Sequence, residues 1–537
     1  MSAKYSSKGL NHLGLVSGMC KELGVADFFD EAHPEQSKDK LVSCGQLVVA
    51  MLLNGLGFVG RTLHMYPEYF ADLPVERLIG EGIQAEYIND DALGRCLDQL
   101  YETGVSELYQ GLSERVVKHL GLPCEGLNLD STSIHVDGQY QCDDADVNAI
   151  KLVRGYSRDH RPELNQVVLN LITENQAGIP VYMQAASGNS NDSEGFKKIV
   201  KAHIGSLKAA QNCRYFIGDA ALYVAETIQS LDEQKQLFIS RVSQKIKQAK
   251  DVLAQAQTSQ FELMDNGYSG IWFDADYGGV KQRWLLVRSE QAEKRECHTL
   301  DKKILKNSEQ SYRSFKKLCL QQFGCEKDLE KALTEWKKAH QYVSVANEKA
   351  VAKAVYKKSG RPQINQEPVR TYYQLAGEVY CDLEKKAEAV AQKGLFILAS
   401  NDCSEALTME KMLSIYKSQQ SVEKGFRFLK SPDFLTSSLY LKKPERIEAL
   451  LMIMTCCLMI YAALEHKIRQ ELKAKSLFFP DMKYKPSQKP TARWVFFCFQ
   501  GIDVLTIAGS SELILNLQER NQTILDCLGE IYQQIYS

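Results

Sequence analysis

Three short apolar runs, each followed by a turn signal, constrain the fold of this 537-residue chain more than any other feature. They read "GLNLDSTSIHV", "NQVVLNLITEN" and "IPVYMQAASG" within residues 126–188, and they are typical of strands joined by short turns. A helical pattern over 193–210, strand-like residues 214–222, a second helical pattern and strand-like residues 236–242 then alternate. Hairpin-like strands followed by alternating helices and strands predict a mixed α/β sheet flanked by helices.

The alternation of helical and strand patterns stops near residue 245 and resumes at residue 394, and these two points divide the rest of the chain. After residue 245 come a β-hairpin pattern that turns at Tyr277-Gly278-Gly279 and two charged helical stretches, 301–322 and 326–358. A strand pattern returns at 394–400, ahead of expected helices at 408–430 and 444–473. We therefore expect five regions: a helical N-terminal region (1–122), a first core segment (123–244), an insertion (245–385), a second core segment (386–475) and a helical C-terminal region (476–537).

The overall charge excludes a globally basic protein, because 65 Lys and Arg face 67 Asp and Glu, a net charge of −2. Residues 301–361 differ, since they hold 15 Lys and Arg against 7 Asp and Glu, an excess of +8. A local basic surface of this kind can bind nucleic acid, although a solvated helical hairpin has the same composition.

The N-terminal residues "MSAKYSSKGLNHLG" lack the apolar run of a signal peptide. The longest apolar stretch, 449–464, is shorter than the roughly 20 residues that a bilayer needs, so we expect a buried core helix and no membrane partner. The 15 cysteines include no CxxC pair, which favours reduced thiols over a zinc site. These features predict a cytoplasmic protein.

Two aspartates occupy unusual places in the strand pattern. Asp130 interrupts the first apolar run, where a carboxylate loses hydration and needs a cation, donor or partner to stay charged. Asp219 ends the apolar run "YFIGDAALY" just before a turn of small residues. Ligands gather at strand ends in α/β folds because loops and helix termini converge there, although a turn or N-cap aspartate also fits this position.

A third acid lies in the helical stretch "YKSQQSVEKGFRFLK". Tyr416, Glu423 and Lys430 are spaced by sevens and would share one stripe of a helix, bordered by Gln419 and Arg427. A separate apolar face would pack against the protein. A solvated helix face with i,i+4 pairs has the same spacing.

The three acids together offer oxygen ligands only. Carboxylate oxygens select Mg²⁺ or Mn²⁺, which keep part of their water and phosphate coordination. Two such ions roughly 4 Å apart activate a water or hydroxyl nucleophile and stabilise the leaving oxygen of a phosphodiester. Asp130, Asp219 and Glu423 are therefore predicted to be both catalytic residues and metal ligands.

At these residues the chain resembles bacterial insertion-sequence transposases of the DDE class. One large group of them carries the helix signature Tyr-x2-Arg-x3-Glu-x6-Lys, which here reads Tyr416, Gln419, Glu423 and Lys430 with every spacing kept. The departure is Gln419, because glutamine can hydrogen-bond a phosphate but cannot neutralise it as arginine does. Arg427, one turn beyond the glutamate, could supply that charge.

The strand motifs of the same group are present and in order. Asp130 matches its first acid within an apolar strand, and Asp219, Ala221 and Tyr223 match its Asp-x-(Gly/Ala)-x-(Tyr/Phe) motif. The resemblance covers nearly the whole chain. It implies an RNase H-like, five-stranded core made by 123–244 and 386–475, interrupted by an insertion domain at 245–385.

The resemblance implies cut-and-paste transposition of the protein's own insertion sequence. Two Mg²⁺ ions, for which Mn²⁺ can substitute, would sit at Asp130, Asp219 and Glu423. Water would free a 3′-hydroxyl at the terminal inverted repeat, and that hydroxyl would attack target DNA; relatives release the second strand through a hairpin. Paired ends imply a homodimer on double-stranded DNA, associated with the nucleoid in a bacterial cytoplasm.

Further DNA contacts follow from the same resemblance. Helix residues beside the acids would hold the DNA backbone, the N-terminal helices would recognise the inverted repeats, and basic loop residues 151–166 would add charge. An insertion-domain tryptophan would stack on a flipped base, although strand tryptophans more often pack in a core. The expected DNA-binding residues are Tyr416, Gln419, Arg427, Lys430, Arg154, Arg158, Trp272 and Trp284.

Two other functions share parts of this pattern. An RNase H-fold nuclease would use the same metal chemistry without strand transfer, but it would not need the long insertion and flanking regions. A DNA-binding regulator descended from a transposase would keep the acids unused, so it would bind DNA without cleaving it.

Overall fold

The computed structural model describes residues 5–33, 41–58, 62–123, 125–136, 149–211, 213–255, 260–357, 367–431, 441–507 and 511–537. The chain forms two compact units. The first comprises Met1–Arg241, Asp276–Gln282 and Ala399–Ser537, and the second comprises Val242–Ala275 and Arg283–Leu398.

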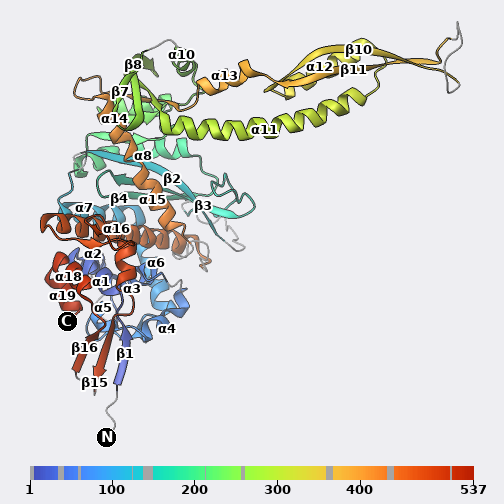
Figure 1. The fold of residues 1–537 in the computed structure, drawn as a ribbon. Helices are drawn as coiled ribbons and strands as arrows, with labels where there is room; N and C mark the ends of the chain where they lie inside the picture. Colours follow the sequence, from blue (N-terminus) through green and yellow to red (C-terminus); the bar gives the residue numbers. More distant parts are fainter. Residues whose placement is uncertain are drawn as a thin grey trace. The chain divides into compact units, whose positions relative to one another are not determined.

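A mixed sheet lies at the centre of the first unit (Figure 1). Strands β2, β3 and β4 form an antiparallel meander, β5 pairs in parallel with β2, and β6 pairs in parallel with β5. These five strands have the order β4-β3-β2-β5-β6 and belong to a nine-stranded sheet, which is larger than the five-stranded sheet that we expected. The predicted mixed α/β sheet is therefore confirmed. Its elements are β2 (Gly126–Val136), β3 (Asn165–Glu174), β4 (Pro180–Ser187), α8 (Asp192–Gln211), β5 (Tyr215–Gly218), α9 (Ala225–Glu233) and β6 (Leu237–Arg241).

The N-terminal region supplies helices that cover this sheet. Tyr109 and Ser113 on its last helix donate hydrogen bonds of 2.8 Å to the β4 carbonyls of Pro180 and Val181. The helices are α1 (Leu13–Glu22), α2 (Val25–Ala32), α3 (Cys44–Leu56), α4 (Tyr66–Ala71), α5 (Val75–Leu78), α6 (Asp90–Thr103) and α7 (Val105–Leu120), with short 3₁₀ turns η2 (Leu63–Met65) and η3 (Ala85–Tyr87).

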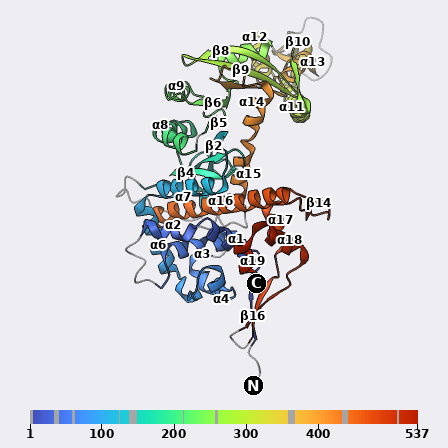
Figure 2. The same cartoon turned by 90° about the vertical axis from the view of Figure 1, so that its left-hand side faces the viewer.

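Helix α16 (Pro444–Ala474) lies between the N-terminal helices and the sheet, where it packs on α1, α3, α6, α7 and β4 (Figures 1 and 2). Arg446 near its start forms a bidentate ion pair with Asp98 of α6, with distances of 2.7 and 2.6 Å. The helix is long and apolar enough to cross a membrane, but 78% of its most apolar window is buried inside the protein. The predicted core helix is confirmed.

The two terminal regions are not purely helical, contrary to the prediction. Strand β1 (Tyr5–Gly9) pairs with β15 (Asp503–Ile507), which pairs with β16 (Ser511–Leu515). The partners of β1 lie about 500 residues away in the chain, so no local pattern identifies the sheet. The remaining C-terminal elements are β13 (Phe479–Pro480), β14 (Pro486–Ser487), α17 (Ala492–Cys498), α18 (Glu519–Leu528) and α19 (Glu530–Ile535).

The helix expected at 408–430 is divided into α14 (Met409–Lys417) and α15 (Gln420–Leu429). Thr408 caps α14 by accepting a hydrogen bond from the amide of Lys411. At the division, the amides of Ser418 and Gln419 bond to carbonyls three residues back, which tightens the backbone there.

The second unit contains most of the hairpin strands β8 and β9 and a helical and stranded arm (Figure 1). The predicted hairpin turn is confirmed, because Gly278 and Gly279 have φ angles of +66° and +76° between adjacent strands β8 and β9. Residues 343–355, expected to continue a helix, form a strand paired with 370–381. The elements are α10 (Lys247–Gln255), β7 (Glu262–Met264), η4 (Asp265–Gly267), β8 (Tyr268–Tyr277), β9 (Val280–Ser289), α11 (Glu290–Leu320), α12 (Glu326–Ala339), β10 (Val343–Val355), β11 (Arg370–Cys381), α13 (Leu383–Ala391) and β12 (Leu395–Ser400).

Candidate active site

Asp130 lies within β2, and its side chain is only 14% exposed. One carboxylate oxygen accepts a hydrogen bond of 2.8 Å from the amide of Ser131. The same oxygen lies 3.6 Å from Nη1 of Arg158, which also donates from Nη2 to the Ser131 hydroxyl at 2.7 Å. The loop before β3 thus places a guanidinium against the buried acid.

The strand register brings Asp219 beside Asp130. In the parallel pair of β2 and β5, Leu129 lies opposite Gly218, so the next residue on each strand is an aspartate. Neighbouring strands are about 4.8 Å apart. Asp219 accepts a hydrogen bond of 2.8 Å from the amide of Ala221, and its own carbonyl accepts one of 2.8 Å from the Ser240 hydroxyl on β6. This turn fixes the acid at the end of its strand.

Glu423 comes from the first turn of α15, which packs on β2 and β3. The buried side chains of Val422, Phe426 and Leu429 hold this helix against the protein and leave Glu423 exposed on another face. The predicted helix over 408–430 is divided, but its second half, α15, still buries the apolar face that was predicted.

The three acids influence one another electrostatically. The pKa of Asp130 is raised from 3.8 to about 7, chiefly by burial, and the charges of Asp219 and Glu423 act in the same direction. The Ser131 amide and Arg158 act in the opposite direction on this pKa. The acids predicted from separate sequence motifs thus share one neighbourhood, and the loss of hydration at Asp130 outweighs the stabilisation of its charged form by the Ser131 amide and Arg158.

Tyr416 borders this neighbourhood. Burial raises the pKa of its phenol to about 12; Arg241 lowers this pKa, whereas Asp219, Glu423 and Asp130 raise it. Arg241 is the last residue of β6 and was not among the predicted site residues. The rule that singled out Asp219, a polar residue at the end of a buried strand, would also have found this arginine.

The acids offer oxygen donors that suit a hard divalent cation. Within the described ranges, however, no group of three or more His, Cys, Asp or Glu side chains is compact enough to hold a metal ion. The donor chemistry therefore fits Mg²⁺, although the three carboxylates do not form a ready-made ligand group in this structure.

The other signature residues have different surroundings. Lys430 donates to both carboxylate oxygens of Asp159 at 3.0 and 2.8 Å, and Asp159 also lies 3.5 Å from Nδ1 of His135. Arg427 is exposed on α15. Gln419 is only 8% exposed, so the expectation that its amide contacts DNA does not hold in this structure. Its place at the tightened helix division buries the side chain.

Three further predicted DNA contacts lie in a loop and in the second unit. Arg154 is exposed on the loop before β3. Trp272 in β8 is partly exposed, and the guanidinium of Arg283 lies over its ring at 4.1 Å from the centroid. Trp284 in β9 is fully buried, which corrects the expectation that it stacks on a base. A base needs an accessible ring face, and this ring is a core residue.

Two family models match parts of this chain. A family model described as a transposase DDE domain matches residues 125–460, more than half of the chain. A second, described as a domain of unknown function (DUF4277), matches residues 5–114. A search of curated proteins gives no match. Among solved structures, the chain is similar to "Cryo-EM structure of piggyBac transposase synaptic complex with hairpin DNA (SNHP)", with 11% identity over 92% of this chain and 82% of that chain and a TM-score of 0.38.

Proposed function

The chain belongs to the transposase DDE-domain family, and we propose that it catalyses metal-dependent cut-and-paste transposition of its own bacterial insertion sequence. The observation that carries this proposal is the convergence of Asp130, Asp219 and Glu423, which come from two adjacent parallel strands and a packed helix. A buried carboxyl with two further acids nearby is costly for stability, and such groups cluster at functional sites.

The sheet supports an RNase H-like core in this proposal. An antiparallel meander of three strands, followed by two strands parallel to the first, is the arrangement expected of that fold. Its acids would stand on the central strand, at the end of the next strand and on a covering helix. Fold alone does not assign function, so the proposal depends on these side chains.

Mg²⁺ bound by Asp130, Asp219 and Glu423 would supply Lewis-acid chemistry, activating the nucleophile and stabilising the leaving oxygen. Binding would require the carboxylates to draw closer than they are in this structure. The tightened backbone at Ser418 and Gln419 is where α15, and Glu423 with it, could adjust.

The other side chains would position DNA. The Tyr416 phenol stays protonated near neutral pH because its pKa is about 12, so it can donate a hydrogen bond to a phosphate oxygen. Arg241, Arg427 and Lys430 would neutralise phosphates beside the acids. In the first step water would attack phosphorus, and the 3′-oxygen would leave as a hydroxyl. In the second, that 3′-hydroxyl would lose its proton and attack a target phosphodiester, whose own 3′-oxygen would leave as a hydroxyl. Two element ends would be paired by a homodimer.

The test uses a labelled duplex that carries one element end, taken from the DNA that flanks the gene. Wild-type protein, Asp130→Asn and Glu423→Gln are incubated with it in Mg²⁺ or in EDTA. We expect nicking at the repeat boundary in Mg²⁺ only, lost in both variants while DNA binding persists. Tight binding by the wild type with no cleavage in Mg²⁺ or Mn²⁺ would instead indicate a regulator.

A further inference from the structure

We propose that the outer face of the β10–β11 ribbon in the second unit is a separate binding surface for duplex DNA, gripping the phosphate backbone through Lys349, Lys353 and Arg370. The choice of DNA as the partner rests on the proposed function. The surface itself is defined by the register, burial and charge of the two strands.

The register of the ribbon separates its side chains into two faces. Opposite residues of an antiparallel pair point to the same side, so Leu375 shares a face with Ala350, and Lys353 shares the other face with Tyr372. A bulge between Ala346 and Lys349 inserts one extra residue in β10. Such a bulge increases the local twist and bends the strand where the distal ribbon begins.

The inner face packs against the helices of the arm only near its base. Leu375 and Val343 are buried in a small core. Farther along β10, the inner face carries Ala352 and Ala354, which are exposed, as the ribbon runs on past α11 and α12 (Figure 1). The other buried residues of this core are Phe315, Leu329, Leu333 and Trp336.

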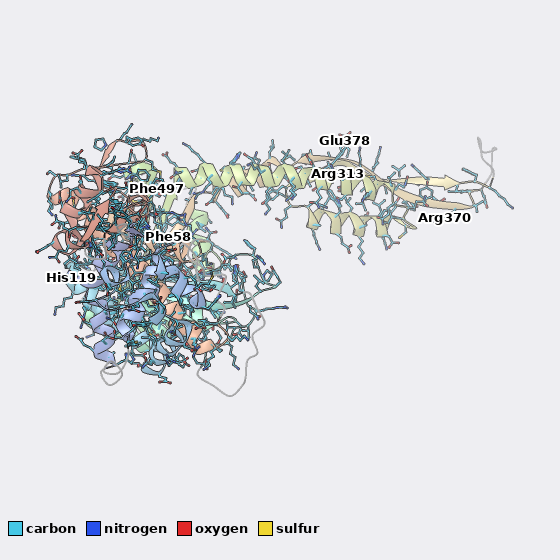
Figure 3. All side chains as sticks on the ribbon, turned by 90° about the horizontal axis from the view of Figure 1, so that it is seen from below. Phe58, His119, Arg313, Arg370, Glu378 and Phe497 are labelled. Carbon is cyan, nitrogen blue, oxygen red and sulfur yellow. The ribbon has the colours of Figure 1, made fainter. Side chains whose placement is uncertain are left out.

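The distal part of the outer face carries three cations, whereas Glu378 lies on the same face nearer the base. Lys349 and Lys353 alternate with Val351 on β10, and Arg370 lies on β11 opposite Val355. All three cations are exposed, and none has an ion-pair partner among the residues that the structure describes. Four residues of strand span about 13 Å, so the cations are spread along the ribbon rather than gathered at one point. Arg370 lies toward the free end (Figure 3).

These features fit DNA better than a protein partner. A protein interface usually has an apolar centre, whereas the inner face beyond the small core carries Ala352, Ala354 and Thr371, which offer little apolar area to bury. A thin ribbon with small side chains behind and cations in front can enter the major groove, which admits two β-strands. The phosphates would supply the negative charge that Lys349, Lys353 and Arg370 otherwise meet only in solvent.

The experiment compares full-length Lys349→Ala/Lys353→Ala/Arg370→Ala with a matched variant, Lys302→Ala/Lys303→Ala/Lys306→Ala, which removes the same charge from α11 in the same unit. Binding to a duplex of arbitrary sequence is measured at several salt concentrations. We expect the ribbon variant to bind at least about tenfold more weakly and its salt slope to fall by about three, one for each phosphate contact. Lys349→Arg/Lys353→Arg/Arg370→Lys should restore both.

Two results would overturn the inference. One is equal binding and an equal salt slope for the ribbon variant, the α11 variant and the wild type. The other is a change in oligomeric state for the ribbon variant, measured by sedimentation, without a change in its DNA affinity; the ribbon would then contact a second copy of the chain.

The failure of this inference is distinguishable from failure of the proposed function. If the wild type cleaves an element end in Mg²⁺ but the ribbon variant binds normally, only the ribbon assignment is wrong. If the ribbon variant loses duplex binding while the wild type cleaves nothing, the DNA surface stands and the transposase proposal falls. Unchanged thermal unfolding of the variant would show that its exposed substitutions leave the fold intact.

Discussion

The sheet of the first unit and the ribbon of the second carry charge in opposite ways. In the sheet, Asp130 is largely buried, and the charges of Asp219 and Glu423 add to the effect of burial in disfavouring its ionised form. On the ribbon, Lys349 and Lys353 stand in solvent on a pair of strands with little core beneath them. A charge on the buried Asp130 destabilises the folded protein, whereas charges on the exposed ribbon have little effect on its stability.

The acids and the ribbon cations should respond differently to mutation. The three acids would act as one catalytic unit, so a change to any one of them should remove the whole effect. Exposed cations act at a distance on phosphates, so their effects should add and weaken with salt. The predictions below test whether the two regions differ in this way.

The largest expected effect is on cleavage. Asp130→Asn and Glu423→Gln should each reduce the rate of nicking of an element end by about 10³-fold or more. The double variant should be no slower than either single variant, because each single substitution already disables the same site. Glu410→Gln, which changes an exposed glutamate on the neighbouring helix α14, should leave the rate unchanged. Rate losses that multiply in the double variant would contradict a shared site.

The second effect is on stability in EDTA. The pKa of Asp130 is raised from 3.8 to about 7 in the folded protein. Between pH 4 and pH 7 the folded protein therefore keeps a proton that the unfolded chain has lost. Stability of the wild type should therefore fall as pH rises from 4 to 7. The free energy of unfolding of Asp130→Asn, relative to that of the wild type, should rise by about 2–4 kcal/mol between pH 4 and pH 8. Urea unfolding at each pH would measure it.

A structural acid provides the control for that experiment. Burial, with Glu107 and Glu445 nearby, raises the pKa of Glu448 on α16 to about 7. Glu448→Gln should gain stability at high pH in the same direction yet keep the nicking rate. If it abolished cleavage as Asp130→Asn does, a raised pKa rather than a place at the site would explain the loss.

The third effect concerns additivity on the ribbon. Lys349→Ala and Lys353→Ala should each weaken duplex binding about three- to tenfold and lower the salt slope by about one, and the double variant should show the sum. Fluorescence anisotropy across a salt series would measure this. A single substitution that removed all the affinity would mean that the ribbon acts as one site, like the acids.

The smallest effect is expected at Lys430, whose ammonium is held by Asp159 in this structure. Asp159→Asn should release it for a phosphate, raising DNA affinity by at most about fivefold while costing under about 1 kcal/mol of stability. Weaker DNA binding in this variant would show that Asp159 orients Lys430 for DNA rather than competing with it.

Local patterns predicted much of the fold because the features concerned are local. Alternating apolar runs indicate the strands of the central sheet, and Gly278-Gly279 marks a turn whose positive φ angles favour glycine. The uninterrupted apolar surface of α16 marks a core helix. Three separate motifs pointed to Asp130, Asp219 and Glu423, and the strand register does place the two aspartates side by side.

Other features depend on distant partners and could not be predicted. Residues 343–355 contain alanines and lysines that favour a helix, but pairing with β11 makes them a strand. Trp284 and Gln419 were expected to face DNA, yet packing buries both. Asp159, which binds Lys430, comes from a loop 271 residues earlier, so the spacing of the helix signature gave no sign of it.

The most direct test of the central claim is strand transfer. A duplex with a free 3′-hydroxyl at the element end is incubated with a target plasmid, Mg²⁺ and either wild-type protein or Glu423→Gln. We predict that the wild type covalently joins the 3′ end to plasmid DNA and that the variant does not. Cleavage of an element end by the wild type without any joining would contradict a transposase and identify a nuclease.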